Sequence, residues 1–356
     1  MQETLDIPRD PDQETVVQAD ALRKLMIDLF VKKGMFPVEA EVVADRLVEA
    51  DLRGIHSHGS RAAPRYLQAI DHGDIDPRGQ VQVIKETGAI GVIDGGRAVG
   101  HLAATRAMEL AIEKARVAGT GTVAVRNGQH FGAAAVYVLM AAKAGMIGYC
   151  TTSTGWATVA AYGSRTSATA NPAIAWGIPV RSGAPVVLDM ACAVSSWGKV
   201  HSQLLYGRPI PSGWALDAAG EPTTDPSAAK TLLPAAGARG YGLAFVSGTL
   251  TGPLVGNKSP LHKTGGVERE GSEHFFYCID VAQFTEIEQF YDEIESTVRD
   301  IQGLQPATGF DRVRLPGELE WERTNDWSKN GIPLHKSHLR DLQEIADKMK
   351  VKTPWE

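Results

Sequence analysis

The first quarter of the chain carries hydrophobic residues at the three- and four-residue spacing of amphipathic helices. One such face is formed by Leu22, Leu25, Met26, Leu29 and Phe30. A second helical segment begins at Pro37 and stops at Gly54, and a third should begin with Ser60 as its N-cap and end at Gly73. The N-terminal part of the protein is therefore predicted to be helical.

From Gly88 onward, short hydrophobic runs alternate with alanine-rich helical segments. Strands are expected over 89–93, 122–126 and 146–151, and helices over 100–118 and 132–144. Such alternation is typical of an α/β fold.

The rest of the chain is less regular. The pattern predicts a short buried strand over 186–190 and helices over 241–254, 285–301 and 337–350. Thr285 and Glu288 form a capping-box pattern at the start of the second of these helices. The Pro- and Gly-rich stretch 207–240 is expected to be a long surface excursion.

Length and charge exclude several classes of protein. A chain of 356 residues is long enough for roughly two domains of about 150 residues each. The net charge of -6 provides no basic surface for a nucleic acid. The longest apolar stretch, 133–150, is interrupted by Lys143 and two glycines, so no membrane span is expected.

The cysteines and the N-terminal residues indicate a reducing compartment. Cys150, Cys192 and Cys278 are odd in number and include no Cys-x-x-Cys pair, as expected of buried thiols. Residues 1–15 are acidic, unlike a secretory signal. We therefore expect a cytoplasmic protein.

The 37 glycines require a search for nucleotide-binding loops. The nearest candidate, Gly240-Tyr241-Gly242, lacks a third glycine and has no acidic residue about 20 positions further on. A Rossmann fold is therefore not expected. This motif either lets the N-terminus of a helix pack closely against its neighbours or holds a phosphate at that N-terminus.

The sequence His56-Ser57-His58-Gly59 stands directly before the third predicted helix, with Arg61 in its first turn. A helix N-terminus favours anions, and a guanidinium can grip a carboxylate through two hydrogen bonds. His58 would then be placed for proton exchange near neutral pH. The alternative is an ordinary loop histidine.

His130 repeats this arrangement between a predicted strand and a predicted helix, which makes it a partner or rival of His58 as proton donor. It could equally cap the helix. Asp189 interrupts an apolar strand, where a charge is costly unless it is paired. An imidazole is its natural partner, although a purely structural hydrogen bond would also satisfy it.

Two other classes of protein remain open from the residues alone. His56 and His58 could supply two ligands of a metal-dependent hydrolase, but no third ligand stands at a suitable spacing, so no metal is expected. A protein that binds a carboxylic acid without turning it over is the other alternative. A serine hydrolase is not supported because no Gly-x-Ser-x-Gly motif occurs.

Several short motifs follow one another in a specific order over about residues 15–320. They are Gly54-Ile55-His56-Ser57-His58-Gly59 with Arg61 and Tyr66, His130-Phe131-Gly132, Asn171-Pro172, Leu188-Asp189-Met190-Ala191, Gly198-Lys199, Pro211-Ser212-Gly213-Trp214, Gly240-Tyr241-Gly242 and Arg314-Leu315-Pro316-Gly317-Glu318. In this order they resemble the malate/L-lactate dehydrogenase family of the non-Rossmann type. That family also includes ureidoglycolate, sulfolactate and diketogulonate oxidoreductases and cyclic imino acid reductases.

The resemblance implies an α/β fold in which a non-Rossmann mixed sheet binds the cofactor and a helical, discontinuous domain is built from both termini. The expected boundaries are 1–79 with 286–356 for the helical part and 80–285 for the sheet-containing catalytic part. The family also implies a homodimer with its active site in a cleft.

The resemblance assigns roles residue by residue. His58 would be the acid/base, Asp189 its partner, Arg61 the carboxylate anchor and His130 a second catalytic candidate. The cofactor would be contacted by Thr152, Thr154, Met190, Ala191, Arg239, Gly240, Pro316, Gly317 and Glu318. The chain departs from the family where Arg239 replaces the usual lysine, and where Gly128-Gln129 and Thr169-Ala170 replace the usual residues before His130 and Asn171.

These roles imply an NAD(P)-dependent oxidoreductase that transfers a hydride between the nicotinamide and C2 of a small 2-hydroxy or 2-oxo acid. NAD is the expected cofactor, with NADP as the alternative. Reduction of a cyclic imino acid is the alternative reaction.

Overall fold

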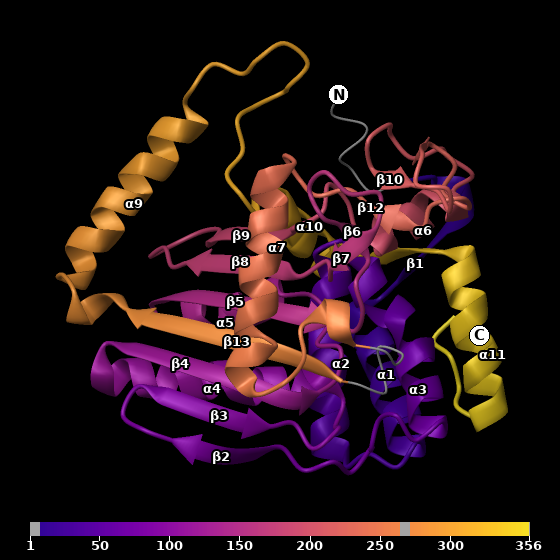
Figure 1. Ribbon diagram of the computed structural model, residues 1–356, viewed down its shortest axis with the longest axis horizontal. Coiled ribbons are helices and arrows are strands. Elements are labelled where there is room, and N and C mark those ends of the chain that lie inside the picture. Colours follow the sequence, from indigo (N-terminus) through magenta and orange to yellow (C-terminus); the bar gives the residue numbers. More distant parts are fainter. Residues whose placement is uncertain (1–7, 264–270, 356) are drawn as a thin grey trace.

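A computed structural model describes residues 8–263 and 271–355, and its largest element is a mixed sheet of seven strands (Figure 1). Across the sheet the strands follow the order β2 (Gln82–Glu86), β3 (Ile90–Asp94), β4 (Thr120–Gly128), β13 (Ser272–Asp280), β5 (Met146–Thr154), β8 (Ala173–Ile178) and β9 (Val186–Ala191). Only β3 and β4 pair in parallel within this described sheet. A Rossmann sheet is mostly parallel, so the expected non-Rossmann mixed α/β fold is confirmed.

The central strand β13 does not follow from the hydrophobic pattern. Phe276 and Cys278 are buried in it, and so are the polar residues Glu273 and His274. These buried polar residues interrupt the pattern that would predict a strand. β13 also comes from far along the chain and inserts between β4 and β5, which local alternation cannot show.

Helices cover both faces of the sheet. α4 (Gly100–Ala118) and α5 (Ala135–Lys143) pack on one face, and α7 (Ala238–Leu250) crosses the other (Figure 1). α4 spans the residues expected of it, and its buried alanines allow a close approach to the strands. At Gly121 of β4 a Cβ would overlap the carbonyl group of Ala111, so this contact requires glycine.

A second hydrophobic core joins the two ends of the chain. It is built by α1 (Ala19–Lys32), α2 (Pro37–Leu52), α3 (Ala63–Asp71), α10 (Glu318–Asn330) and α11 (Lys336–Met349). β1 (Glu14–Val17) pairs antiparallel with β14 (Ile332–His335). The helical part therefore comes from both termini, although the sequence pattern does not predict α10.

The expected domain boundaries stay a prediction, and α9 (Ile287–Gln302) bears on them. The expected helical part includes α9, but this helix has no buried residue and projects away from the rest of the molecule (Figure 1). Its acidic side chains pair with Arg181, which follows β8.

The capping box expected at the start of α9 is wrong. The N-cap residue is Glu286, and no side chain caps the helix there. Glu288 instead pairs with the Arg181 guanidinium at 2.8 Å, so its carboxylate is directed away from the backbone it was expected to cap.

The stretch 207–240 is not a plain surface excursion. It contains β10 (Ala215–Leu216), β11 (Pro222–Thr223) and β12 (Thr231–Leu232), which form a five-stranded sheet with β6 (Val159–Ala160) and β7 (Ser167–Thr169). Together with α6 (Trp197–Leu205) this small sheet encloses a hydrophobic cluster that includes Trp214 and Leu232. Strands of two residues are too short to show a period in the sequence.

Within residues 8–263 and 271–355, no helix is both long enough and apolar enough to cross a membrane.

Candidate active site

The loop after α2 carries the His-Ser-His-Gly motif and folds as two short 3-10 turns, His56–His58 and Ser60–Ala62. Asp51, in the last turn of α2, holds both turns. Its carboxylate accepts hydrogen bonds from His56 Nδ1 at 2.9 Å and from the Ser60 backbone N–H at 2.7 Å. A Cβ at Gly59 would overlap this carboxylate, so the close approach requires glycine.

Ser60 is not the N-cap of the third helix. α3 begins at Ala63, and no side chain caps it. The Ser60 hydroxyl instead lies 3.3 Å from His338 Nε2 of α11. Arg61 therefore lies in the 3-10 turn that leads into α3, two residues before the first residue of that helix, and not in its first turn as expected.

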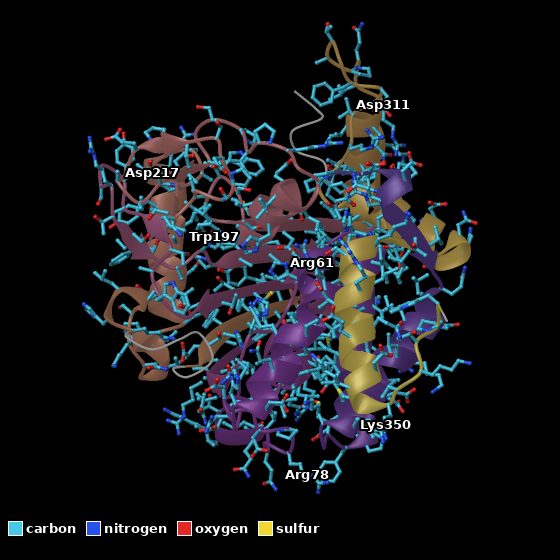
Figure 2. The ribbon with its side chains drawn as sticks, turned by 90° about the vertical axis from the view of Figure 1, so that its right-hand side faces the viewer. Arg61, Arg78, Trp197, Asp217, Asp311 and Lys350 are labelled. Atoms are coloured by element: carbon cyan, nitrogen blue, oxygen red, sulfur yellow. The ribbon has the colours of Figure 1, made fainter. Side chains whose placement is uncertain are left out.

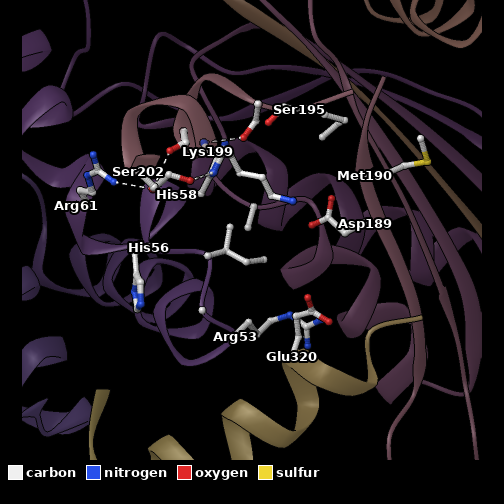
Figure 3. A pocket seen from close by; sticks show the side chains of 18 of the residues that line it. Arg53, His56, His58, Arg61, Asp189, Met190, Ser195, Lys199, Ser202 and Glu320 are labelled. Atoms are coloured by element: carbon white, nitrogen blue, oxygen red, sulfur yellow. Dashed lines mark hydrogen bonds between the residues drawn. The ribbon is translucent and has the colours of Figure 1, made fainter. Parts of the chain in front are cut away.

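Two cavities meet at this turn. The first, which we call the Asp189 cavity, has a volume of about 460 Å³ and is lined by residues including His58, Arg61, Asp189, Met190, Lys199 and Glu320 (Figure 3). The second, which we call the Arg65 cavity, has a volume of about 590 Å³ and is lined by residues including His58, Arg61, Arg65, His130, Trp156 and Lys230. His58 and Arg61 line both cavities, so ligands on either side would contact the same two side chains.

His58 is neutral at pH 7. Burial among protein atoms, together with the nearby positive charge of Arg65, lowers its pKa to about 4. Its Nδ1 shares a hydrogen bond of 2.9 Å with Ser57 Oγ. Its ring is stacked on that of His130 with the centroids 5.4 Å apart, so the two predicted proton donors lie side by side.

His130 is held in one tautomer. Its Nδ1 accepts the backbone N–H of Gly132 at 3.3 Å and lies 2.6 Å from the Tyr66 hydroxyl oxygen. Because a backbone N–H can only donate, the neutral ring carries its proton on Nε2. Burial lowers the His130 pKa well below its usual value, and the nearby charge of Arg65 lowers it further. α5 begins at Ala135, so His130 does not cap that helix.

Asp189 does not have the partner expected from the sequence. Its Oδ2 accepts the backbone N–H of Ala135 at 2.9 Å, at the start of α5, and no described hydrogen bond joins it to an imidazole. The side chain is also exposed to the cavity rather than enclosed in an apolar strand. Surrounding protein atoms desolvate the carboxyl group and raise its pKa, although the Ala135 N–H opposes this.

Several charged residues of the Asp189 cavity were given no role in the sequence analysis. Figure 3 shows Lys199 directed toward Asp189, and Arg53 beside Glu320 of α10. Arg53 is buried, and no described hydrogen-bond partner reaches its Nε. Lys199 stands in one of the family-like motifs, but only the fold shows that it faces Asp189.

The residues expected at the cofactor separate into two groups. Met190 and Ala191 line the Asp189 cavity. The segment with Pro316, Gly317 and Glu318 lies beside β9, where the Pro316 carbonyl accepts the Val187 N–H at 2.9 Å, and the next residues, Leu319 and Glu320, line the cavity.

In the second group, Thr152, Arg239 and Gly240 are not among the described residues that line the Asp189 cavity. Thr152 is buried and its hydroxyl lies 2.8 Å from His274 Nδ1, whereas Thr154 pairs through its backbone with Ser272. Arg239 and Gly240 lie in the first turn of α7. They follow Ala235 in the sequence, and Ala235 does line the cavity. The cofactor contacts assigned to these four residues stay a prediction.

The described residues give little support to the alternative of a metal centre. Among them, no group of three or more His, Cys, Asp or Glu side chains is arranged to hold a metal ion. His56 Nδ1 is bonded to Asp51, and the His56 ring stacks on Trp327 at 5.7 Å.

The chain was also compared with known proteins. Residues 17–343 match the family described as malate/L-lactate dehydrogenase. The malate dehydrogenase of Pyrococcus abyssi is 35% identical over 347 residues, covering 94% of this chain and 95% of that protein. The ureidoglycolate dehydrogenase (NAD(+)) of Escherichia coli K12 is 33% identical, covering 89% and 92% respectively.

Two solved structures extend the comparison. Malate dehydrogenase from Pyrococcus horikoshii superposes with a TM-score of 0.87 at 32% identity and covers 96% of this chain and 97% of that one. Delta1-piperideine-2-carboxylate reductase from Pseudomonas syringae pv. tomato superposes with a TM-score of 0.83 at 27% identity and covers 93% and 100% respectively. On its sequence, its fold and the order of its site motifs, the chain belongs to the malate/L-lactate dehydrogenase family.

Proposed function

We propose that this protein is an NAD-dependent oxidoreductase that interconverts a small 2-hydroxy acid and its 2-oxo acid. The observation that carries the proposal is that His58 and Arg61 line both cavities at once. A proton-exchanging group and a carboxylate anchor must both stand where the cofactor and the acid meet, because only there can the reacting carbon contact both.

The Asp189 cavity suits a nicotinamide cofactor. Small residues, among them Ala133, Ala134 and Ala173, leave room along its wall for a flat ring. Arg53 and Lys199 provide positive charge for a pyrophosphate, and the unpartnered Nε of Arg53 supports such a role. A bound nicotinamide supplies or takes up a hydride at C4 of its ring.

The Arg65 cavity would then hold the acid. Arg61 binds the carboxylate next to C2, and its guanidinium is only lightly engaged, by the Ser202 hydroxyl at 3.2 Å. Neutral His58 accepts the proton of the C2 hydroxyl during oxidation. For reduction, the negative charge of the bound carboxylate raises the pKa of His58, so that His58 can carry the proton that it donates.

Reduction of a cyclic imino acid is the second candidate. It is favoured by the similarity to the Pseudomonas syringae reductase. The same anchor and proton donor would serve a ring nitrogen in place of a carbonyl oxygen.

A spectrophotometric panel tests the proposal. The purified protein is mixed with NADH or NADPH and with 2-oxo acids or cyclic imino acids, and absorbance is followed at 340 nm. We expect absorbance to fall with NADH and a 2-oxo acid. A fall only with cyclic imino acids would establish the second candidate, and no fall with any pair would overturn both.

Two further properties belong to this proposal. We propose a homodimer, because large apolar side chains are exposed on α7. We also propose a cytoplasmic location, which the three buried and unpaired cysteines support.

A further inference from the structure

The Arg65 cavity has a strongly positive wall. Arg61, Arg65 and Lys230 line it, and none of its described lining residues is Asp or Glu. The three histidines of the wall, His58, His130 and His201, have pKa values lowered by burial, so they add little positive charge at pH 7.

Arg61 and Arg65 come from one end of the cavity. Arg61 lies in the 3-10 turn before α3 and Arg65 in the first turn of α3, and both side chains line the cavity. The Arg65 guanidinium lies 5.2 Å from the centre of the Tyr66 ring, whose hydroxyl contacts His130. The charge of Arg65 is thus close to the predicted proton donors, and it lowers the pKa of both.

Lys230 comes from a different element, the small five-stranded sheet. It directly precedes β12, and its backbone N–H is bonded to the Leu216 carbonyl of β10 at 2.8 Å. Trp197 of α6, labelled with Arg61 in Figure 2, completes the wall between these parts of the fold. A ligand in the cavity would therefore meet cations from two separate elements.

These cations are not neutralised by the protein. In the described part of the chain, no carboxylate forms a salt bridge with Arg61, Arg65 or Lys230, whereas several other arginines, among them Arg23, Arg106, Arg165 and Arg314, pair with an acidic neighbour. One carboxylate next to C2 would occupy Arg61 and leave Arg65 and Lys230 without a counter-charge.

We propose that the Arg65 cavity selects substrates with two anionic groups, and that Arg65 and Lys230 are the residues that bind the second group. The proposal rests on the proposed function and adds the substrate class. The preferred substrate is then a short 2-oxo or 2-hydroxy acid with a second carboxylate or a sulfonate. Acids with one negative charge, whether open-chain or cyclic imines, leave two cations unpaired and bind less well.

The test compares kcat/KM for 2-oxobutanedioate with that for 2-oxobutanoate, which has the same chain length and one charge fewer. We expect the wild type to prefer the diacid by more than tenfold. Arg65→Gln should reduce this preference by about 10- to 100-fold, and Lys230→Met should also reduce it. Arg65→Lys should restore part of it, and Arg116→Gln on the exposed end of α4 should leave it unchanged.

Equal use of the two acids by the wild type would overturn the proposal, as would an equal loss with both acids in Arg65→Gln. Measuring kcat/KM for an acid with a sulfonate in place of the second carboxylate shows which of the two anionic groups the cavity prefers. Calorimetric binding of butanedioate against butanoate separates this proposal from the proposed function. If no acid is reduced but only the diacid binds, and Arg65→Gln abolishes that binding, the charge selection stands and the reaction is wrong. If neither acid binds, the charge selection is overturned.

Discussion

At the residue scale, the site is defined by neutral histidines next to cations. His58 and His130 are stacked, and each has its Nδ1 engaged by a neighbouring group, Ser57 for the first and Tyr66 for the second. Of these two histidines, His58 lines both cavities, whereas His130 lines the Arg65 cavity alone. This position makes His58 the better candidate for proton exchange, with Ser57 rather than Asp189 as its direct partner.

Replacement of His58 tests this assignment. We expect His58→Ala to lower kcat by roughly 10² to 10⁴, the usual contribution of general acid–base catalysis, with little change in cofactor affinity. Steady-state kinetics and a cofactor titration measure the two effects. The matched variant is His130→Ala. If it loses more activity than His58→Ala, the proton donor is His130.

Buried histidines also make stability depend on pH. Burial lowers the pKa of His101 and of His274 to about 3, and in the described structure neither ring nitrogen of His101 has a hydrogen-bond partner. An unfolded histidine has a pKa of about 6.5, so below that pH the unfolded chain binds more protons than the folded one. Stability should therefore fall as the pH drops from about 6.5 toward 3.

The expected loss for each of these histidines is about 2 kcal/mol between pH 7 and pH 5. Urea unfolding at the two pH values measures it. His101→Phe removes one of these titrating groups while keeping a ring against Tyr66, so its free energy of unfolding should depend less on pH. The same pH dependence in His101→Phe and wild type would contradict this explanation.

At the element scale, two polar contacts bring the site segments together. Asp51 ties the end of α2 to the turn that carries His58. His274 of β13 lies 2.8 Å from the Thr152 hydroxyl on β5 and 3.0 Å from the Gln129 carbonyl, next to His130. The Thr152 hydroxyl therefore takes part in the contact between β5 and β13.

Asp51→Asn should weaken the first of these connections. An amide can keep one acceptor but loses the charge that both donors face, so we expect a loss of about 1 to 3 kcal/mol in the free energy of unfolding. We also expect kcat/KM to fall at least tenfold because His58 and Arg61 move with the turn. Glu41→Gln, on an exposed position of the same helix, is the control and should change neither. Normal activity in a destabilised Asp51→Asn would show that the turn keeps its shape without the carboxylate.

At the scale of the whole molecule, the exposed side of α7 is unusually apolar. Phe245 is 61% exposed and Val246 is 56% exposed, next to the partly exposed Leu243. Apolar side chains gathered on one helix face are typical of a surface that another chain covers. This is the basis of the proposed homodimer.

Phe245→Glu tests the assembly. Charge on both copies of this face should repel, so we expect sedimentation to show a dimer for the wild type and a shift toward monomer for the variant. Val117→Glu, at an exposed apolar position on α4, is the control. A wild-type monomer, or a dimer unaffected by Phe245→Glu, would remove α7 from the interface.

Features that depend on local periodicity and on short motifs could be predicted from the sequence. The helical spacing of Leu22 to Phe30, the alanine-rich segment of α4 and the loop with His58 and Arg61 each lie within a few consecutive turns of chain, so their pattern is visible in the sequence. The order of the motifs was also enough to identify the family.

Features that depend on residues far apart in the chain became visible in the folded protein. β13 enters the centre of the sheet from a distant segment, Asp189 finds the backbone of Ala135, and Lys230 joins Arg65 at one cavity. The neutral state of His58 also depends on the fold, because burial and the nearby Arg65 guanidinium lower its pKa. Desolvation and charge act through space, and a linear sequence does not record which groups become neighbours.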